Sequence, residues 1–406
     1  MWIPYILNNM KQRELALDIL YRSIKEESYS NLLMRKELEK IDSIQRPFVT
    51  NLVNGVLRNY EFLIYQFEED TKEKTSLRTK LIICMALFER FYNHEKDYVV
   101  NNEYVELGKN KYEKAYINAL LHKMKDLKQA KKDYQRCCLP EWIFNLLKSQ
   151  YDEDEFEKII EVYRTIPEVY YRLNKKKGDY TKLKDLKIDI VNEDIFTGKE
   201  NLLNSEEYKK GFFYVQDFNS ASLYKHLDLQ EDDSLLDMCA APGSKLFNCL
   251  DIVNEENVFG NDLHENRVEL IRKMAKKLGY EKIHLSCHDA RKLDEIYENR
   301  FDKILLDAPC SGLGVIGRKP DLKFHIRPES LDELQKLQSE LLESADRLLN
   351  SGGIMLYSTC TLNKKENARL VKKFLEGHDE LELLEEETII NSLGDCFYYA
   401  KIRKVA

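Results

Sequence analysis

The sequence predicts an all-α N-terminal domain followed by an α/β domain with a doubly wound parallel sheet. From Arg13 to about Lys125, apolar residues recur every three or four positions, which is the spacing of helices that bury one face. From Ser234 to the end, short apolar runs alternate with helical stripes. That alternation is typical of strands and helices that form a parallel sheet.

Composition indicates a folded chain with two or three domains. The 406 residues are 43% hydrophobic and include only 8 Pro and 15 Gly, which favours a helix-rich protein without long flexible linkers. The net charge is −8, yet residues 11–136 hold 24 Lys and Arg against 20 Asp and Glu. Because the charge is unevenly spread, its total does not exclude a nucleic-acid partner.

The cysteines and the apolar runs indicate the cellular compartment in which the protein is expected. None of the nine cysteines forms a C-x-x-C pair, so we expect no metal site and no disulfide framework. No apolar run approaches the length of about 18 residues that a membrane span needs, and Trp2–Leu7 lacks the flanks of a signal peptide. We therefore expect a reduced, cytoplasmic protein without a membrane partner. Residues 1–9 carry no element signal, so Met10 is a candidate start.

The pattern divides the chain into three regions, 10–130, 131–215 and 216–406. The first is helical throughout. The second is a linker with a small α+β subdomain, in which we expect a helix at Glu141–Tyr151 and strands near Tyr170–Leu173 and Ile188–Val191. Its basic run Lys175–Gly178 looks like a charged turn, and such runs are more often solvated than bound to phosphate.

The third region predicts strands separated by helices. The expected strands are Ser234–Met238, Val258–Asp262, Ile283–Ser286, Lys303–Asp307, Gly353–Ser358 and Cys396–Ile402. The loop after the first strand opens a helix, as in nucleotide-binding folds, but it has only Gly243 and lacks the G-x-G-x-x-G pattern.

Three carboxylates follow the next three strands: Asp262, Asp289 and Asp307. One such residue is expected by chance as a cap. Three at one sheet edge indicate a nucleoside ligand, with Asp262 suited to ribose hydroxyls and Asp289 to an adenine amino group. This plan matches an S-adenosylmethionine-dependent methyltransferase better than a dehydrogenase.

Two cysteines lie at the same edge, Cys310 after the fourth strand and Cys360 after the fifth. A lone cysteine is more often a small core residue, and by itself the loop beside Asp307 would make Cys310 the candidate nucleophile. Methylation of a pyrimidine at carbon 5 explains why thiols are needed. A thiolate must first add to carbon 6, after which carbon 5 attacks the methyl group, a base removes the carbon-5 proton and the thiolate leaves.

Several stretches of the chain resemble the NOL1/NOP2/Sun family of RNA 5-methylcytosine methyltransferases. The stretches are FYVQDFNSA (213–221), LLDMCAAPGSK (235–245), FDKILLDAPCSGLGVIGRKPD (301–321), LQKLQSELL (334–342), GGIMLYSTCTLNKKEN (352–367) and GDCFYYAKI (394–402). Residues 11–130, most clearly NNEYVELGK (101–109), resemble the NusB-like helical RNA-binding domain of bacterial members that modify small-subunit ribosomal RNA.

The resemblance implies a Rossmann-like class I methyltransferase domain, S-adenosyl-L-methionine as cofactor, small-subunit ribosomal RNA as partner and a monomer. It makes Cys360 the nucleophile and Cys310 the group that assists product release, with Asp307 as the active-site carboxylate and Lys245 near the cofactor's methionine end or the base. The implied cofactor residues are Cys239, Ala240, Ala241, Pro242, Gly243, Ser244, Lys245, Asp262, Asp289 and Asp307.

The resemblance also implies that Arg318, Lys319 and Lys323 meet the RNA backbone. The chain departs from the family at Ser244, where a second Gly is usual, and at Leu246, where a Thr is usual.

Two alternatives stay open from the residues. A DNA cytosine-5 methyltransferase uses a Pro-Cys nucleophile, and Pro309–Cys310 would fit it, although Cys360 and the helical domain speak against it. A catalytically inactive RNA-binding or ribosome-assembly factor is the other, and the presence of both cysteines, three carboxylates and Lys245 speaks against it.

Overall fold

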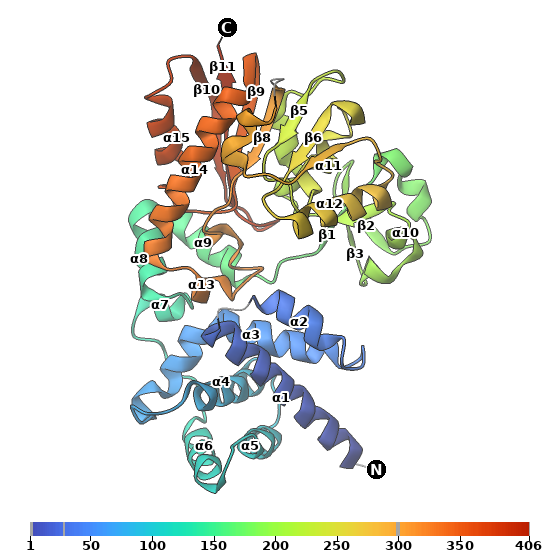
Figure 1. The fold of residues 1–406 in the computed structure, drawn as a ribbon. Helices are drawn as coiled ribbons and strands as arrows, with labels where there is room; N and C mark the ends of the chain where they lie inside the picture. The colour runs from blue at the N-terminus through green and yellow to red at the C-terminus, as the bar shows by residue number, and fades with distance from the viewer. Residues whose placement is uncertain (1–2, 27–28, 298–300, 406) are drawn as a thin grey trace. The chain divides into compact units, whose positions relative to one another are not determined.

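The computed structural model describes residues 3–26, 29–297 and 301–405. They form two compact units (Figure 1). One unit comprises Met1–Tyr151 and Lys319–Arg327, and the other comprises Asp152–Arg318 and Pro328–Ala406. The helical unit thus runs past the expected boundary at residue 130, and it includes a segment from within the expected 216–406 domain.

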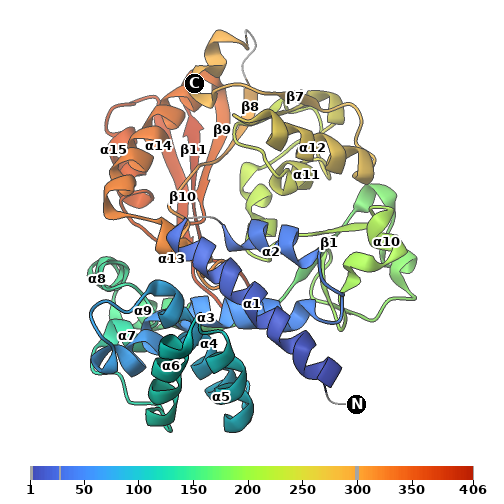
Figure 2. The ribbon, with the colours of Figure 1, turned by 60° about the horizontal axis from the view of Figure 1, so that its bottom comes forward.

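The first unit is helical, as the apolar stripes predict. Its helices are α1 (Ile3–Lys25), α2 (Ser30–Leu38), α3 (Arg46–Phe67), α4 (Leu77–Phe91), α5 (Asp97–Glu106), α6 (Lys111–Lys123), α7 (Asp133–Arg136), α8 (Glu141–Gln150) and α13 (Leu322–His325). Helix α4 packs against α1, α3, α5 and α6 (Figure 2). Val49, Leu52 and Val53, which follow the predicted helical spacing, are fully buried. Helix α1 begins at Ile3, where we expected no element before Met10.

The segment Lys319–Arg327 is built into the core of this helical unit. Phe324 packs against Tyr60 with ring centroids 5.1 Å apart. Lys323 is buried, and its Nζ lies 2.6 Å from Glu61 Oε2. Removing either partner would leave an unpaired buried charge, which is costly, so this ion pair helps to hold the segment on the helices.

The second unit begins with a small antiparallel sheet in the order β2-β3-β1-β4. Its elements are α9 (Glu153–Arg164), β1 (Tyr170–Leu173), β2 (Ile188–Ile190), β3 (Ile195–Gly198), α10 (Glu206–Lys209) and β4 (Phe213–Val215). The basic run forms the 3-10 turn Lys175–Lys177, and Lys175 pairs with Asp194 at 2.6 Å while Lys177 donates to the carbonyl of Lys277 at 2.6 Å. These lysines are held by the protein itself.

The large sheet has seven strands in the order β10-β11-β9-β8-β5-β6-β7. Its strands are β5 (Leu235–Asp237), β6 (Val258–Asn261), β7 (His284–Ser286), β8 (Phe301–Asp307), β9 (Leu349–Thr359), β10 (Leu381–Ile389) and β11 (Phe397–Lys404). The doubly wound parallel sheet is confirmed for β9, β8, β5, β6 and β7. At one edge, β11 runs antiparallel to β9 and β10 antiparallel to β11. Strand β10 was not expected, because its exposed glutamates hide any apolar alternation.

Helices cover both faces of this sheet (Figures 1 and 2). On one side lie α11 (Ser244–Cys249) and α12 (Glu265–Leu278), and on the other α14 (Pro328–Leu348) and α15 (Ala368–Leu375). Burial on both faces explains why the central strands read as short apolar runs. Within the described ranges, no helix combines the length and apolarity required to cross a bilayer.

Candidate active site

The carboxyl ends of β5, β8 and β9 bring the expected catalytic residues to one edge. Strand β8 pairs in parallel with both β5 and β9, and Asp307 lies opposite Ser358 in the register. The loop with Cys310 leaves β8 and the loop with Cys360 leaves β9 at this level. The two loops therefore share one edge of the sheet, where ligands bind in open α/β folds.

The two thiols are in direct contact. Cys310 Sγ lies 3.4 Å from Cys360 Sγ, and both residues are partly exposed. The hydrogen bond with Cys360 and then burial raise the pKa of Cys310 well above its ordinary value. Cys310 therefore keeps its proton at neutral pH.

An ion pair lies beside the thiols. Lys245 Nζ is 2.7 Å from Asp307 Oδ2, and the Ser358 hydroxyl donates to Asp307 Oδ1 at 2.9 Å. Burial works against the charge on Lys245, but Asp307 outweighs burial, so the pKa of Lys245 is raised. Lys245 remains an ammonium and can donate hydrogen bonds, but it cannot accept a proton.

The loop from Cys239 to Lys245 makes a tight turn into α11. Gly243 has φ of +104° and a Cβ there would lie 2.7 Å from the Phe247 ring, so this position requires glycine. Ser244 is the first residue of α11 and has no left-handed backbone. The turn thus tolerates serine where the family usually has a second glycine. Leu246 is fully buried in the core beneath.

The carboxylate of Asp262 contacts the same loop. Its Oδ2 accepts a hydrogen bond from the amide of Ala241 at 3.3 Å, and its Oδ1 accepts one from the amide of His264 at 3.2 Å. Arg267 Nη2 lies 3.3 Å from Asp262 Oδ2 and also donates to the carbonyl of Ala241 at 3.0 Å. Asp262 therefore fixes the loop as well as the end of β6.

Asp289 follows β7 and binds its own neighbour. Arg291 donates to it from Nε at 2.9 Å and from Nη2 at 2.6 Å. The hydrogen bonds from Arg291 lower the pKa of Asp289. Arg291 also reaches Glu340 at 3.0 Å. The carboxylate is thus ionised and accessible, but it is paired with a cation from the chain.

Sequence reasoning missed Asp237, the last residue of β5. It is almost fully buried, and its Oδ1 accepts a hydrogen bond from the amide of Cys239 at 3.3 Å. Burial, followed by the charge of Asp307, raises the pKa of Asp237 to about 8. The available signal was an acidic residue at the end of an apolar run, just before the loop from Cys239 to Lys245.

The three expected RNA contacts differ in their surroundings. Lys319 is exposed. Arg318 is partly exposed and is held by Asp217 at 2.8 Å and Asp395 at 3.0 Å. The expectation for Lys323 is wrong, because its side chain is only 1% exposed and its ammonium is bound to Glu61.

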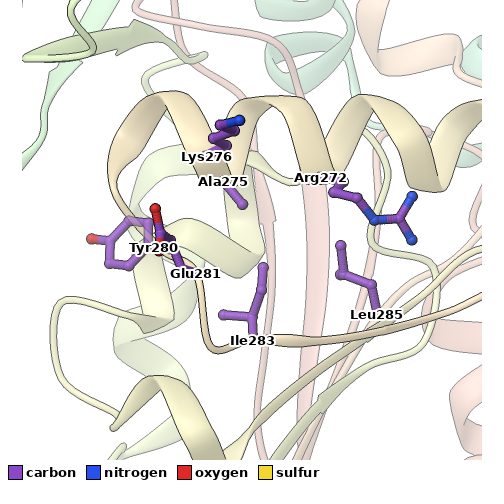
Figure 3. A pocket seen from close by; sticks show the side chains of 7 residues that line it. All are labelled: Arg272, Ala275, Lys276, Tyr280, Glu281, Ile283 and Leu285. Atoms are coloured by element: carbon purple, nitrogen blue, oxygen red, sulfur yellow. The ribbon is translucent and has the colours of Figure 1, made fainter.

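A pocket and a possible metal-binding cluster in this unit contain none of the expected site residues. A hollow of about 480 Å³ between α12 and β7 is lined by Arg272, Ala275, Lys276, Tyr280, Glu281, Ile283 and Leu285 (Figure 3). Asp346, His378 and Glu380 are close enough to share a metal ion. However, the Lys404 ammonium lies 2.9 Å from Asp346 Oδ1, which disfavours a second cation there.

Comparison with protein families agrees with this geometry. Residues 224–401 match the family model described as 16S rRNA methyltransferase RsmB/F. Residues 10–126 match the model of the NusB family.

Individual proteins show the same likeness along the chain. The probable ribosomal RNA small subunit methyltransferase B of Bacillus subtilis (strain 168) is 29% identical over 91% of this chain and 89% of its own. The ribosomal RNA small subunit methyltransferase B of Yersinia enterocolitica is 29% identical over 90% of this chain and 92% of its own. The crystal structure of PH0851, 21% identical, superposes with a TM-score of 0.76 over 96% of this chain and 98% of its own, and shows the shared fold. Residues 224–401 are thus similar to the RsmB/F methyltransferases, and residues 10–126 are similar to the NusB family.

Proposed function

We propose that this protein methylates carbon 5 of a cytosine in 16S ribosomal RNA, with S-adenosyl-L-methionine as the methyl donor. The observation that carries the proposal is the pair of thiols 3.4 Å apart, beside the Lys245–Asp307 ion pair at 2.7 Å. A single nucleophile could be supplied by one cysteine. Two thiols in contact fit a reaction in which a thiolate must both add to a pyrimidine and leave it.

The proposed first step uses Cys360. Its thiolate attacks carbon 6 of the cytosine, a sulfur–carbon bond forms, and the electrons of the carbon 5–carbon 6 double bond make carbon 5 nucleophilic. The Lys245 ammonium, which Asp307 holds in place, suits stabilisation of negative charge that develops on the base. Because Lys245 keeps its proton, it is not the group that removes the carbon-5 proton.

The second half of the reaction uses Cys310. After methyl transfer, a base takes the carbon-5 proton, the double bond re-forms and the bond to Cys360 breaks. Cys310 retains its proton in the structure, since its pKa is raised by the hydrogen bond with Cys360 and by burial. A neutral thiol in contact with the departing sulfur is suited to donate a hydrogen bond to that thiolate as it leaves.

The residues at the strand ends fit the proposed cofactor. Bound S-adenosyl-L-methionine supplies an electrophilic methyl group on a sulfonium. Gly243 leaves room where a Cβ would meet Phe247, Asp262 is suited to the ribose hydroxyls, and Asp289 is suited to the adenine amino group. The backbone from Cys239 to Lys245 would line the space between them, as such loops do in related folds.

The family supports an RNA substrate over DNA. The two relatives named above are small-subunit ribosomal RNA methyltransferases by name, and the NusB-family match covers the helical part. We expect a monomer that acts in the cytoplasm, with Lys319 on the RNA side. Radioactive methyl transfer to 16S RNA but not to duplex DNA, with 5-methylcytosine identified by mass spectrometry, would support this substrate; labelling of DNA would overturn it.

The roles of the two thiols can be separated with two variants. Cys360→Ala should abolish methyl transfer, by roughly 10⁴-fold or more since the nucleophile is removed, and should form no protein–RNA adduct. Cys310→Ala should accumulate an adduct that survives on a denaturing gel. The opposite pattern would exchange the roles, and the absence of an adduct in both variants would contradict the covalent route.

A further inference from the structure

Glu366 is a fully buried carboxylate between the two cysteine loops. It accepts hydrogen bonds from the Ser311 amide at 2.9 Å and the Ser311 hydroxyl at 2.6 Å. It also accepts from Gln338 Nε2 and from Asn363 Nδ2, both at 3.0 Å. All four donors are uncharged. Burying a carboxylate among neutral donors is costly, and an apolar residue would fill the space more cheaply.

The donors to Glu366 flank the thiols in the chain. Ser311 follows Cys310, and Gln338 also donates to the carbonyl of Pro309 at 2.8 Å, on the other side of Cys310. The Ser311 hydroxyl lies 2.6 Å from that of Thr361, which follows Cys360. Glu366, which lies on the segment that follows Cys360, therefore joins that segment directly to the Cys310 loop through Ser311.

The backbone around this cluster is also fixed. Tyr357 donates to the carbonyl of Glu366 at 2.8 Å. The amide of Gly314 donates to the carbonyl of Cys360 at 2.9 Å, and a Cβ on Gly314 would lie 2.8 Å from that carbonyl oxygen. The two loops therefore pack closely. We expect a change at Glu366 to alter the distance between the thiols.

Glu366 also acts on Cys310 by charge. After the hydrogen bond with Cys360 and burial, the charges of Cys360 and then Glu366 contribute to the raised pKa of Cys310. The cation of the site, Lys245, interacts instead with Cys360 and Asp307. Two chemically identical thiols thus have different electrostatic neighbours, a negative group next to Cys310 and a positive one next to Cys360.

We propose that Glu366 is a positioning residue that holds Cys310 against Cys360 and so serves the release half of the reaction. The inference rests on the proposed function, in which Cys360 attacks and Cys310 assists departure. It assigns the buried carboxylate a role that a core residue of the same size could not fill, because only an acceptor can hold Ser311, Gln338 and Asn363 together.

The test is Glu366→Gln in the full chain, which keeps the size and removes the charge. We expect turnover on 16S RNA to fall about tenfold to a hundredfold. This is at or below the lower end of the roughly 10²- to 10⁴-fold range of general acid–base catalysis, because Glu366 acts through Cys310. We also expect a covalent RNA adduct to accumulate as in Cys310→Ala, while the KM for the cofactor stays within about twofold. Combining Glu366→Gln with Cys310→Ala should lower turnover no further than Cys310→Ala alone, because both act through one thiol.

A second variant and a control keep the test decisive if Glu366→Gln is poorly folded. Ser311→Ala removes only the bridging hydroxyl and should raise the adduct fraction by a smaller factor. Glu89→Gln, which alters a buried ion pair with Arg13 in the helical unit, should lower the melting temperature without raising that fraction.

Three results would overturn the inference. The first is a wild-type level of covalent adduct in both Glu366→Gln and Ser311→Ala. The second is a variant Glu366→Gln that forms the adduct and releases it with equally reduced rates. The third is a double variant whose turnover falls by the product of the two single losses. A wild-type protein that makes neither 5-methylcytosine nor an adduct would instead overturn the proposed function.

Discussion

The two halves of the site differ in what holds their functional groups. At the thiol half, the loops are joined by buried hydrogen bonds, such as Ser311 to Thr361 and Ser311 to Glu366, both at 2.6 Å. At the carboxylate half, Asp262 and Asp289 are paired with Arg267 and Arg291, whose side chains are 47% and 45% exposed.

This difference separates groups whose spacing is fixed from groups whose ion-pair partners a ligand can replace. Water does not reach these buried groups, so breaking one of the hydrogen bonds would leave a donor or acceptor unpaired. The spacing of the thiols is therefore fixed before any substrate arrives. The Asp289–Arg291 pair is partly exposed on both sides, and exposed ion pairs contribute little stability, so Arg291 can give way to a ligand. The Asp262–Arg267 pair differs, because the Asp262 side chain is only 3% exposed. The loops of the two thiols are thus held by buried hydrogen bonds, whereas Asp289, which we propose binds the cofactor, has a partner that a ligand can replace.

Among the changes that test this comparison, the largest effect should come from the cation paired with Asp307. Lys245→Met leaves Asp307 without its partner at 2.7 Å and removes the charge beside the base. We expect methyl transfer to fall roughly 10²- to 10³-fold, as for other preorganised electrostatic contacts, in single-turnover assays with labelled cofactor. Lys273→Met, on the exposed surface of α12, is the matched control. Near wild-type rates in Lys245→Met would show that the thiol half works without this cation.

A stability effect of intermediate size should come from Asp237. Its folded pKa is raised to about 8, chiefly by burial, from an ordinary value of 3.8. The contribution of Asp237 to the free energy of unfolding is highest below about pH 4, where the residue is protonated in both the folded and the unfolded state. It is lost as pH rises towards 8, because the unfolded state ionises while the folded state keeps its proton. Asp237→Asn should therefore gain stability over the wild type across that window, by on the order of a few kcal/mol. Urea unfolding without cofactor, from pH 4.5 to 9, measures this; a difference that does not change with pH would contradict it.

The smallest effect should come from freeing Asp289. Arg291→Ala removes the cation that lies 2.6 Å from this carboxylate. If the pair must be exchanged for the cofactor, the Kd for S-adenosyl-L-methionine should fall about two- to fivefold, in line with the energy of an exposed ion pair. Titration calorimetry measures this, with Arg272→Ala, whose partners are Glu265 and Glu269, as the control. Weaker binding would mean that Arg291 itself contacts the ligand.

Much of the fold follows from periodic patterns. The helical stripes and the central strands were predictable because burial imposes a spacing of three to four residues or an unbroken apolar run. Strand β10 was not, since Glu385, Glu386 and Glu387 lie on an exposed edge where charges carry no strand signal. The antiparallel edge also depends on pairing between distant strands, which local patterns do not encode.

The site was only partly predictable. Loops at neighbouring strand ends must lie close together, so the nearness of Cys310 and Cys360 could be expected, and the structure shows them in contact. Asp237 and Glu366 were missed because a buried acid and a surface acid look alike in sequence. Lys323 was misassigned for the converse reason, since a lysine buried against Glu61 looks like any surface cation.

The segment Lys319–Arg327 has a consequence for how the chain can be divided. Because it belongs to the helical unit, the chain passes between the two units three times, after Tyr151, after Arg318 and after Arg327. Residues 152–406 expressed alone would present Phe324 and the ammonium of Lys323 without the helices that cover them. The helical part is therefore not an interchangeable module. A recombination event or a domain swap at one junction would leave part of the helical core behind in the methyltransferase half.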